Sequence, residues 1–380
     1  MESRRVRPDR VGHIEAEKQM RLSKRVTAPA IAGTTLMVAL ASCGDSSTTS
    51  ATSGVVAAAP ADAVVANHPG LPGYKISVFA GFARGSQTFI NPDSVEVDGN
   101  TVWVGFQNVT AKDGSDGKTS TIVQYKLDGT FVKQYTVPGH NDGLRVDPKT
   151  HLVWATSNED GNPALNIIDP NSGTVTPYQF PPTPHGGGYD DLQFVGGMTF
   201  IAASNPTLDA SGNNVFPAVD SVQLNGTNVV LTPVLMGNAT ATDTISKQPV
   251  TLNLTDPDAM SQTSGQLVLV SQGDSVLITI KNPGTPQQSV TKTPVGNQLE
   301  DTVWTTTSHG RLLVVDGQSN NLYWVHETQP AGTVFTEAPN DSGVAGFLAT
   351  LDLTTGFLHP VMIGFLHTTG LFYVPDPGSS

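Results

Sequence analysis

Residues 140–146 read His140-Asn141-Asp142-Gly143-Leu144-Arg145-Val146 and combine an acidic turn with the short apolar strand that follows it. Such a segment is called an opening below, because it stands at the start of a repeat. Openings of the same kind stand at residues 91–97, 189–194 and 299–304, and a less regular one lies around residues 256–258. The repeat unit is roughly 40 to 50 residues long, which suits one four-stranded propeller blade. Because no such sheet can bury both of its faces alone, the repeat predicts a β-propeller, in which the sheets stack radially around a channel.

The segments between the openings favour antiparallel sheet. Pairs such as Asp128-Gly129 and Asn225-Gly226 separate the apolar segments, and these residues readily take the positive φ of tight hairpin turns. The chain shows no long amphipathic helical pattern, so the predicted fold class is all-β. A second strand is expected after each regular opening, at residues 101–106, 152–156, 198–203 and 311–315.

The two ends of the folded region are expected to meet. About 300 residues follow Tyr74, which suits a single large all-β domain, predicted at residues 73–380. Residues 74–80 form one strand before the first repeat, and residues 346–375 contain the last strands. If both chain ends share the last blade, no edge strand remains, and this arrangement predicts six blades, with seven as the alternative. A pair of face-to-face sheets is the competing architecture, but it would not require the same opening in each repeat.

The N-terminal region has the features of an export signal. Basic residues precede an apolar run at residues 26–42, and Leu40-Ala41-Ser42-Cys43 resembles the lipobox of bacterial lipoproteins. Cys43 is the only cysteine of the chain, and the resemblance implies that it carries a lipid after cleavage. Residues 1–43 are therefore predicted to be a lipoprotein signal peptide, with Met20 as an alternative start. An uncleaved membrane anchor and an ordinary secretory peptide are the other interpretations.

Residues 44–72 consist mainly of Ser, Thr, Ala, Pro and Gly, which bury too little apolar area to offset chain entropy. This segment is predicted to be a disordered tether between the lipid and the folded domain. The predicted location is the cell envelope, outside the cytoplasm, where the lipid attaches the protein to a membrane on the periplasmic or outer-surface side.

The chain carries a net charge of −13, and the acidic residues are concentrated after Cys43. Beyond that residue, 12 Lys and Arg stand against 29 Asp and Glu. A surface of this charge repels phosphate backbones, so nucleic acid is not expected as a partner. The same charge favours cations.

The motif at residues 141–148, followed by the strand at residues 152–156, resembles the SMP-30/gluconolactonase/luciferin-regenerating family, which reads Asn-Asp-Gly and then an Asp-Pro turn before a small-residue strand. The spacing of the repeats is also similar to that of NHL and YncE-like repeat proteins. Resemblance to the gluconolactonase group implies a six-bladed propeller with a divalent cation, such as Ca²⁺, over its channel. It also implies hydrolysis of lactones, with the metal acting as a Lewis acid.

The same resemblance implies a set of metal ligands. Asn141 matches the asparagine that binds the cation in that family, and Asp190 and Asp191 stand where the family has a second asparagine. Asp301 opens a later repeat and is the third implied ligand and a candidate catalytic residue. The early glutamate of the family's Glu-Gly-Pro motif has no counterpart in this chain. The expected cofactor is therefore Ca²⁺ or another divalent cation, with no organic cofactor.

Three functions fit these observations. Propellers often serve as platforms that bind a partner, and the long polar loops and few convergent catalytic groups favour binding of a protein or small-molecule ligand at the propeller mouth. A Ca²⁺-dependent hydrolase of the lactone type is the alternative. A second alternative follows from Pro184-His185-Gly186, which resembles the motif of streptogramin-lyase-like propellers, where the histidine is the base of a metal-assisted elimination. His185 is therefore a further catalytic candidate, and whether the protein is an enzyme stays open.

Overall fold

The computed structural model describes residues 68–81, 89–341 and 343–378. The chain separates into two compact units, Met1–Val56 and Ala57–Ser380, and the described residues belong to the second unit. The predicted signal peptide, Cys43 and most of the predicted tether lie outside the described residues. Within the described part, every regular element is a β-strand, and no helix is long and apolar enough to cross a membrane.

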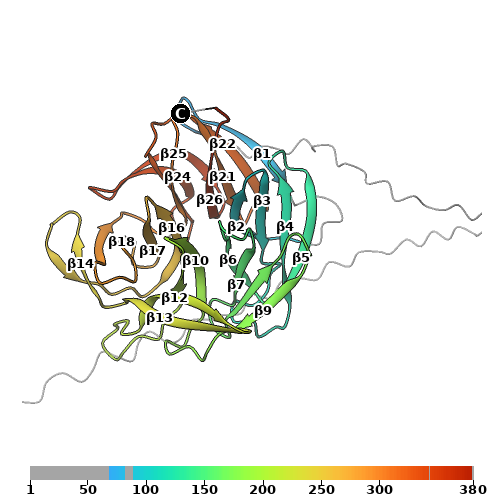
Figure 1. Cartoon of the computed structure of the whole chain (residues 1–380). Helices are drawn as coiled ribbons and strands as arrows, with labels where there is room; N and C mark the ends of the chain where they lie inside the picture. The colour runs from blue at the N-terminus through green and yellow to red at the C-terminus, as the bar shows by residue number, and fades with distance from the viewer. Residues whose placement is uncertain (1–67, 82–88, 342, 379–380) are drawn as a thin grey trace, which may run out of the picture. The chain divides into compact units, whose positions relative to one another are not determined.

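The strands form antiparallel meanders (Figure 1). One four-stranded sheet contains β2 (Pro92–Asp98), β3 (Thr101–Phe106), β4 (Thr119–Lys126) and β5 (Phe131–Pro138). The next meander contains β6 (Asn141–Val146), β7 (Val153–Ser157), β8 (Ala164–Ile168) and β9 (Val175–Gln179). It shares an eight-stranded sheet with β10 (Tyr189–Val195), β11 (Met198–Ala203), β12 (Pro217–Asn225) and β13 (Asn228–Met236). A single parallel pairing, between Asn228 and Gln179, joins these two meanders at their outer strands.

The remaining strands complete the architecture. β16 (Pro257–Thr263), β17 (Gln266–Ser271), β18 (Val276–Lys281) and β19 (Ser289–Pro294) form a meander that β14 (Thr240–Asp243) and β15 (Pro249–Thr251) extend at its outer edge. A further sheet contains β20 (Thr302–Trp304), β23 (Val334–Ala338), β24 (Gly346–Asp352) and β25 (Phe357–Phe365). The last sheet contains β26 (Thr368–Pro375), β21 (Gly310–Asp316), β22 (Asn321–Glu327) and β1 (Lys75–Gly81).

The innermost strands of the meanders close a ring. β2 contacts β6, β6 contacts β10, β10 contacts β16, β16 contacts β20, β20 contacts β26, and β26 contacts β2. Figure 1 shows β2, β6, β10, β16 and β26 grouped around the centre of the described unit. A cyclic order of radial meanders is that of a β-propeller, so the predicted fold class is confirmed and two face-to-face sheets are excluded.

The hydrophobic core lies between neighbouring meanders. In β3, Val102 and Val104 pack with Leu313 and Val315 of β21, whereas Trp103 packs with residues of β6 and β7 on the other side. Side chains of a strand alternate between its two faces, so each meander contributes to two different core clusters. Each sheet is therefore covered on both faces only when the ring is complete.

The chain ends meet in one sheet, as the sequence predicts, because β1 and β26 both belong to the sheet of β21 and β22. The strand expected at residues 311–315 is present as β21, and it belongs to a different sheet from the opening at residues 299–304. β21, which covers that strand, pairs with β26 from Gly310 opposite Pro375 to Asp316 opposite Thr368, whereas β20 pairs with β23. β20 has only three residues, so it offers too short an edge for the seven residues of β21.

Residues 68–72, at the end of the predicted tether, include side chains and backbone groups that contact the strands. The imidazole of His68 lies 4.8 Å from the ring of Tyr323 and 4.6 Å from that of Phe365. The backbone N–H of Leu71 donates to the carbonyl of Val361 in β25. These contacts attach the end of the predicted tether to the sheets. The tether was predicted from its small side chains, and this composition does not show such contacts.

Candidate metal centre at the channel mouth

The innermost strands begin with β-bulges that carry aspartates at equivalent positions. The pairing register shifts between Pro92 and Val95, between Asn141 and Leu144, between Tyr189 and Leu192, and between Pro257 and Met260. A bulge re-aims the side chains of the extra residue, which is why one short motif repeated in each meander directs its carboxylates to a common place. The first residue inside each bulge is an aspartate: Asp93, Asp142, Asp190 and Asp258.

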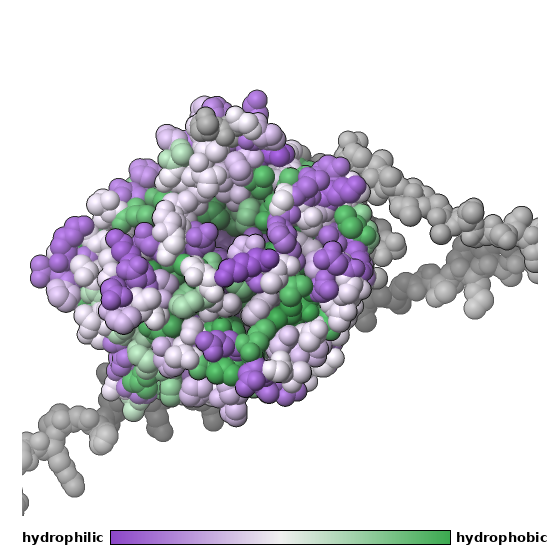
Figure 2. Space-filling model, in the orientation of Figure 1, coloured by the Kyte–Doolittle hydropathy of each residue, from purple (hydrophilic) through white to green (hydrophobic). Residues whose placement is uncertain are grey.

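These four aspartates line one cavity of about 770 Å³. Eleven carboxyl side chains line it, from Asp93, Asp142, Glu159, Asp160, Asp190, Asp191, Asp256, Asp258, Glu300, Asp301 and Asp341, against Lys112, Arg145 and one histidine, His367. Figure 2 shows a face of the described unit that is hollowed near its centre, with hydrophilic residues around the hollow. The cavity is therefore strongly acidic and attracts cations.

The charge on these carboxylates is poorly compensated. Burial, reinforced by the negative charge of Asp142, raises the pKa of Asp93, Asp190 and Asp258 well above the usual range. A side-chain interaction with Asp142 raises the pKa of the Asp190 carboxyl further. Buried carboxylates without enough positive partners are costly to ionise, and a bound cation would remove that cost.

Arg145 supplies one of the two positive charges, at the centre of the ring. Its Nη2 donates to Asp191 Oδ2, to Asp301 Oδ1 at 3.2 Å and to the carbonyl of Met260 at 2.8 Å. Glu96 Oε2 lies 3.9 Å from its Nε. The backbone N–H of Leu371 donates to Asp301 Oδ2. This buried network joins all the innermost segments of the ring, from β2 to β26.

Three of the four sequence-predicted ligands, Asp190, Asp191 and Asp301, line the cavity. Asp191 and Asp301 are hydrogen-bonded to Arg145, a residue that sequence reasoning did not single out. Asn141 is fully buried, donates to the carbonyls of Gly143 and Thr156, and does not line the cavity. Its Oδ1 faces Gly105 of β3 so closely that a Cβ atom there would clash. Asp190 lines the cavity together with Asp142.

His185, the other catalytic candidate, is fully buried and does not line the cavity. Its ring lies edge-on to that of Tyr189, with centroids 5.2 Å apart. Burial lowers its pKa to about 4, so the ring is neutral at physiological pH. This position is that of a packed aromatic residue at the base of the 181–188 loop, away from the acidic groups.

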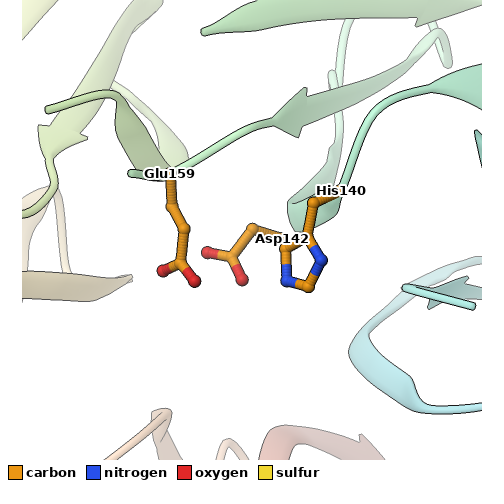
Figure 3. Close-up of side chains that lie close together, drawn as sticks. All are labelled: His140, Asp142 and Glu159. Atoms are coloured by element: carbon orange, nitrogen blue, oxygen red, sulfur yellow. The ribbon is translucent and has the colours of Figure 1, made fainter. Parts of the chain in front are cut away.

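A different set of side chains does converge at the mouth. His140, Asp142 and Glu159 each offer a ligand atom, and these atoms all lie within 4.8 Å of one another. Figure 3 shows the imidazole and the two carboxyl groups directed toward the same space. The β6–β7 hairpin explains this meeting, because Asn141 pairs with Ser157, which places the residues before β6 beside those after β7. The antiparallel pairing of the two predicted strands was the signal that could have revealed Glu159.

No family model matches the chain, and no curated protein matches it. Similar solved structures include a protein of unknown function from Bacteroides caccae, with 8% identity and a TM-score of 0.46, over 80% of this chain and 100% of that chain. They also include the periplasmic gluconolactonase of Pseudomonas aeruginosa, with 11% identity and a TM-score of 0.44, over 80% of this chain and 99% of that chain.

A protein from Lactobacillus plantarum has 11% identity and a TM-score of 0.42, over 80% of this chain and 99% of that chain. The gluconolactonase activity is that of the Pseudomonas aeruginosa protein.

Proposed function

We propose that the protein is an exported β-propeller of the cell envelope that binds a divalent cation, and through it a small polar ligand, at the mouth of its channel. The observation that carries this proposal is the cavity with eleven carboxyl side chains against one lysine, one arginine and one histidine. Oxygen ligands from several short side chains suit a hard divalent cation. The envelope location and the lipid anchor at Cys43 rest on the sequence of residues 1–43 alone.

The proposed ring has six blades. The eight-stranded sheet counts as two blades, because its two four-stranded meanders share only the pairing between Asn228 and Gln179. The strands β14 and β15 are an extension of the β16–β19 blade and do not form a blade of their own. The predicted alternative of seven blades would require a further innermost strand in the contact cycle that runs through β2, β6, β10, β16, β20 and β26.

The first test is stabilisation by cations. After treatment with a chelator, addition of Ca²⁺, Mn²⁺ or Zn²⁺ in excess at pH 7.5 is expected to raise the melting temperature by about 5 °C, since saturation at a hundredfold excess over Kd contributes about 2.7 kcal/mol. The measurement is differential scanning calorimetry, with Na⁺ at matched ionic strength as the control. No shift with any divalent cation would contradict the proposal.

A second candidate function is hydrolysis of a lactone. Its specific support is the cavity of about 770 Å³ beside the acidic cluster, which has room for a sugar-sized ligand. His140, Asp142 and Glu159 would hold the cation, which would supply Lewis-acid polarisation of a carbonyl group. The Asp190 carboxyl, whose pKa is raised by burial and by Asp142, lies in the same cavity and could hold or accept a proton there.

Activity on a panel of aldonolactones distinguishes these two functions. If the second candidate is correct, hydrolysis measured by proton release requires the divalent cation, is lost with chelator and falls by about a hundredfold or more in Asp190→Asn. The conservative variant Asp128→Asn, in a surface turn that does not line the cavity, is the control and is expected to stay active. Cation binding without turnover of any lactone would exclude the hydrolase and leave the binding function.

A further inference from the structure

We infer that His140, Asp142 and Glu159 form a three-ligand site for one divalent ion of the zinc, manganese or iron(II) class, and that this ion displaces the ammonium group of Lys112 from Glu159. The inference rests on the proposed function, which requires only that some divalent cation binds at the mouth. It specifies the ligands, the class of the ion and the group that the ion replaces.

The imidazole of His140 is prepared as a ligand. Its Nδ1 lies 3.0 Å from the carbonyl oxygen of Thr110 and 2.9 Å from Thr110 Oγ1. A carbonyl can only accept, so Nδ1 carries the proton and Nε2 carries the free lone pair. His140 is 4% exposed, and its Nε2 has no hydrogen-bond partner among the described residues. A buried nitrogen without a hydrogen-bond partner, beside two carboxyl groups, is placed to bind a cation.

The backbone around the site is fixed independently of the ligand side chains. The N–H of His140 donates to Asn158 Oδ1 at 2.9 Å, and the carbonyl of His140 accepts from the N–H of Asn158 at 2.8 Å. Asn141, between the two ligands, is anchored by its hydrogen bonds to Gly143 and Thr156. His140 and Asp142 stand on either side of Asn141, and Figure 3 shows that both side chains are directed toward Glu159.

The ligand set favours a borderline metal over Ca²⁺. An imidazole nitrogen suits zinc and other transition metals, and a site with three protein ligands keeps further positions for water or substrate. Calcium prefers six to eight oxygen ligands and gains little from nitrogen. The three ligand atoms lie within 4.8 Å of one another. Bonds of about 2.0–2.2 Å separate opposite ligands by up to about 4.4 Å, so a small rotation of the side chains is sufficient.

Lys112 occupies the place of the missing positive charge. Its Nζ lies 2.5 Å from Glu159 Oε1, and its side chain is 60% exposed, so it can leave the carboxylate at little cost. Glu159, by contrast, is largely buried, with a side chain that is 11% exposed. In the metal-free protein the ammonium group neutralises Glu159, and an arriving divalent ion competes with it for the same oxygen. The displaced ammonium group then faces the cavity, where it can contact an anionic group of a ligand.

The test compares metal binding by calorimetry in two substituted proteins and their matched controls. His140→Ala is expected to weaken Zn²⁺ and Mn²⁺ binding by about tenfold or more, while Ca²⁺ binding changes less. His151→Ala is the control, because that histidine is 64% exposed and pairs with Asp98 far from the mouth. Binding of Co²⁺ to the wild-type protein is expected to give visible absorption bands that change in His140→Ala.

The second arm tests displacement of the lysine. Lys112→Met is expected to strengthen Zn²⁺ binding by about threefold or more, because it removes the competing charge. Lys118→Met is the control, since Lys118 lies on the same loop, is 62% exposed and pairs with Asp116 instead. Unchanged affinity in Lys112→Met would overturn the displacement, even if His140→Ala fails to fold.

The outcomes separate this inference from the proposed function. If Zn²⁺ binds equally to the wild-type protein and to His140→Ala, the triad is not the site, although the acidic mouth still binds a cation. If Ca²⁺ binds more tightly than Zn²⁺ and is indifferent to His140, the assigned ion class is wrong. If no divalent ion binds the wild-type protein, the proposed function fails and the inference fails with it.

Discussion

Replacing Arg145 with methionine is expected to lower the free energy of unfolding by about 3–5 kcal/mol at pH 8. The guanidinium group donates to Asp191, Asp301 and the carbonyls of Leu144 and Met260. Its loss would leave several buried carboxylates around an uncharged side chain, and removing one partner of a buried ion pair costs far more than the pair contributes. Denaturation by urea, followed by tryptophan fluorescence, measures the effect.

The other arginine in the described residues provides the control. Arg311 pairs with Asp376 at 3.5 Å and lies over the ring of Trp324. Its side chain is 23% exposed, so Arg311→Met is expected to cost about 1 kcal/mol or less. The loss in Arg145→Met should shrink toward pH 5, because the carboxyl groups freed from the guanidinium take up protons there. Equal losses in the two variants would show that the central network does not hold the ring together.

Replacing Glu337 with glutamine is expected to stabilise the protein by about 2 kcal/mol or more at pH 8. Glu337 lies on β23, is fully buried, and neither carboxyl oxygen has a hydrogen-bond partner among the described residues. Burial raises its pKa well above the usual range, and the charges of Asp301 and Asp316 raise it further. Glutamine mimics the protonated carboxyl and cannot ionise.

The sign of the pH dependence follows from the proton count. Above the unfolded pKa of about 4.3, the unfolded chain has released the proton of Glu337 while the folded chain retains it. The folded state then binds more protons, so stability decreases as the pH rises until the folded pKa is reached. The gain in Glu337→Gln should therefore vanish near pH 4 and grow toward pH 8 in thermal unfolding curves.

A surface aspartate, whose pKa is shifted in the opposite direction, provides the control. The pKa of Asp128 is lowered by its hydrogen bonds to Thr130 in a tight turn. Neutralising this group in Asp128→Asn removes an interaction with the charged form, so no stabilisation at pH 8 is expected. If both variants behave alike, the effect of Glu337 does not come from its buried charge.

The sequence predicted much of the ring because its information is local. The openings at residues 91–97, 140–146 and 189–194 are followed by the expected hairpins, β2–β3, β6–β7 and β10–β11. In each case an apolar strand of ordinary length follows a turn, and both strands can pair along their whole edge. The opening at residues 299–304 is also followed by the expected strand, but β20 pairs with β23 and β21 pairs with β26.

The site was predicted less well, because side-chain direction depends on pairing register. Asn141, Asp191 and Asp301 carry the right chemistry, but Asn141 turns toward Gly105, and the two aspartates turn toward Arg145. His140 and Glu159 are separated in the chain and meet because Asn141 pairs with Ser157. A shift of one residue in that register would have sent each side chain to the opposite face.

The sequence by itself determined an acidic all-β chain with a repeated motif, since turn chemistry, strand alternation and net charge are properties of neighbouring residues. Only the tertiary structure decided which carboxylates face Arg145, which face the open cavity, and which histidine keeps a free nitrogen beside them. Bulges and ring closure between residues far apart in the chain set those directions. Electrostatic interactions depend on such distances in space, and the order of residues along the chain does not contain them.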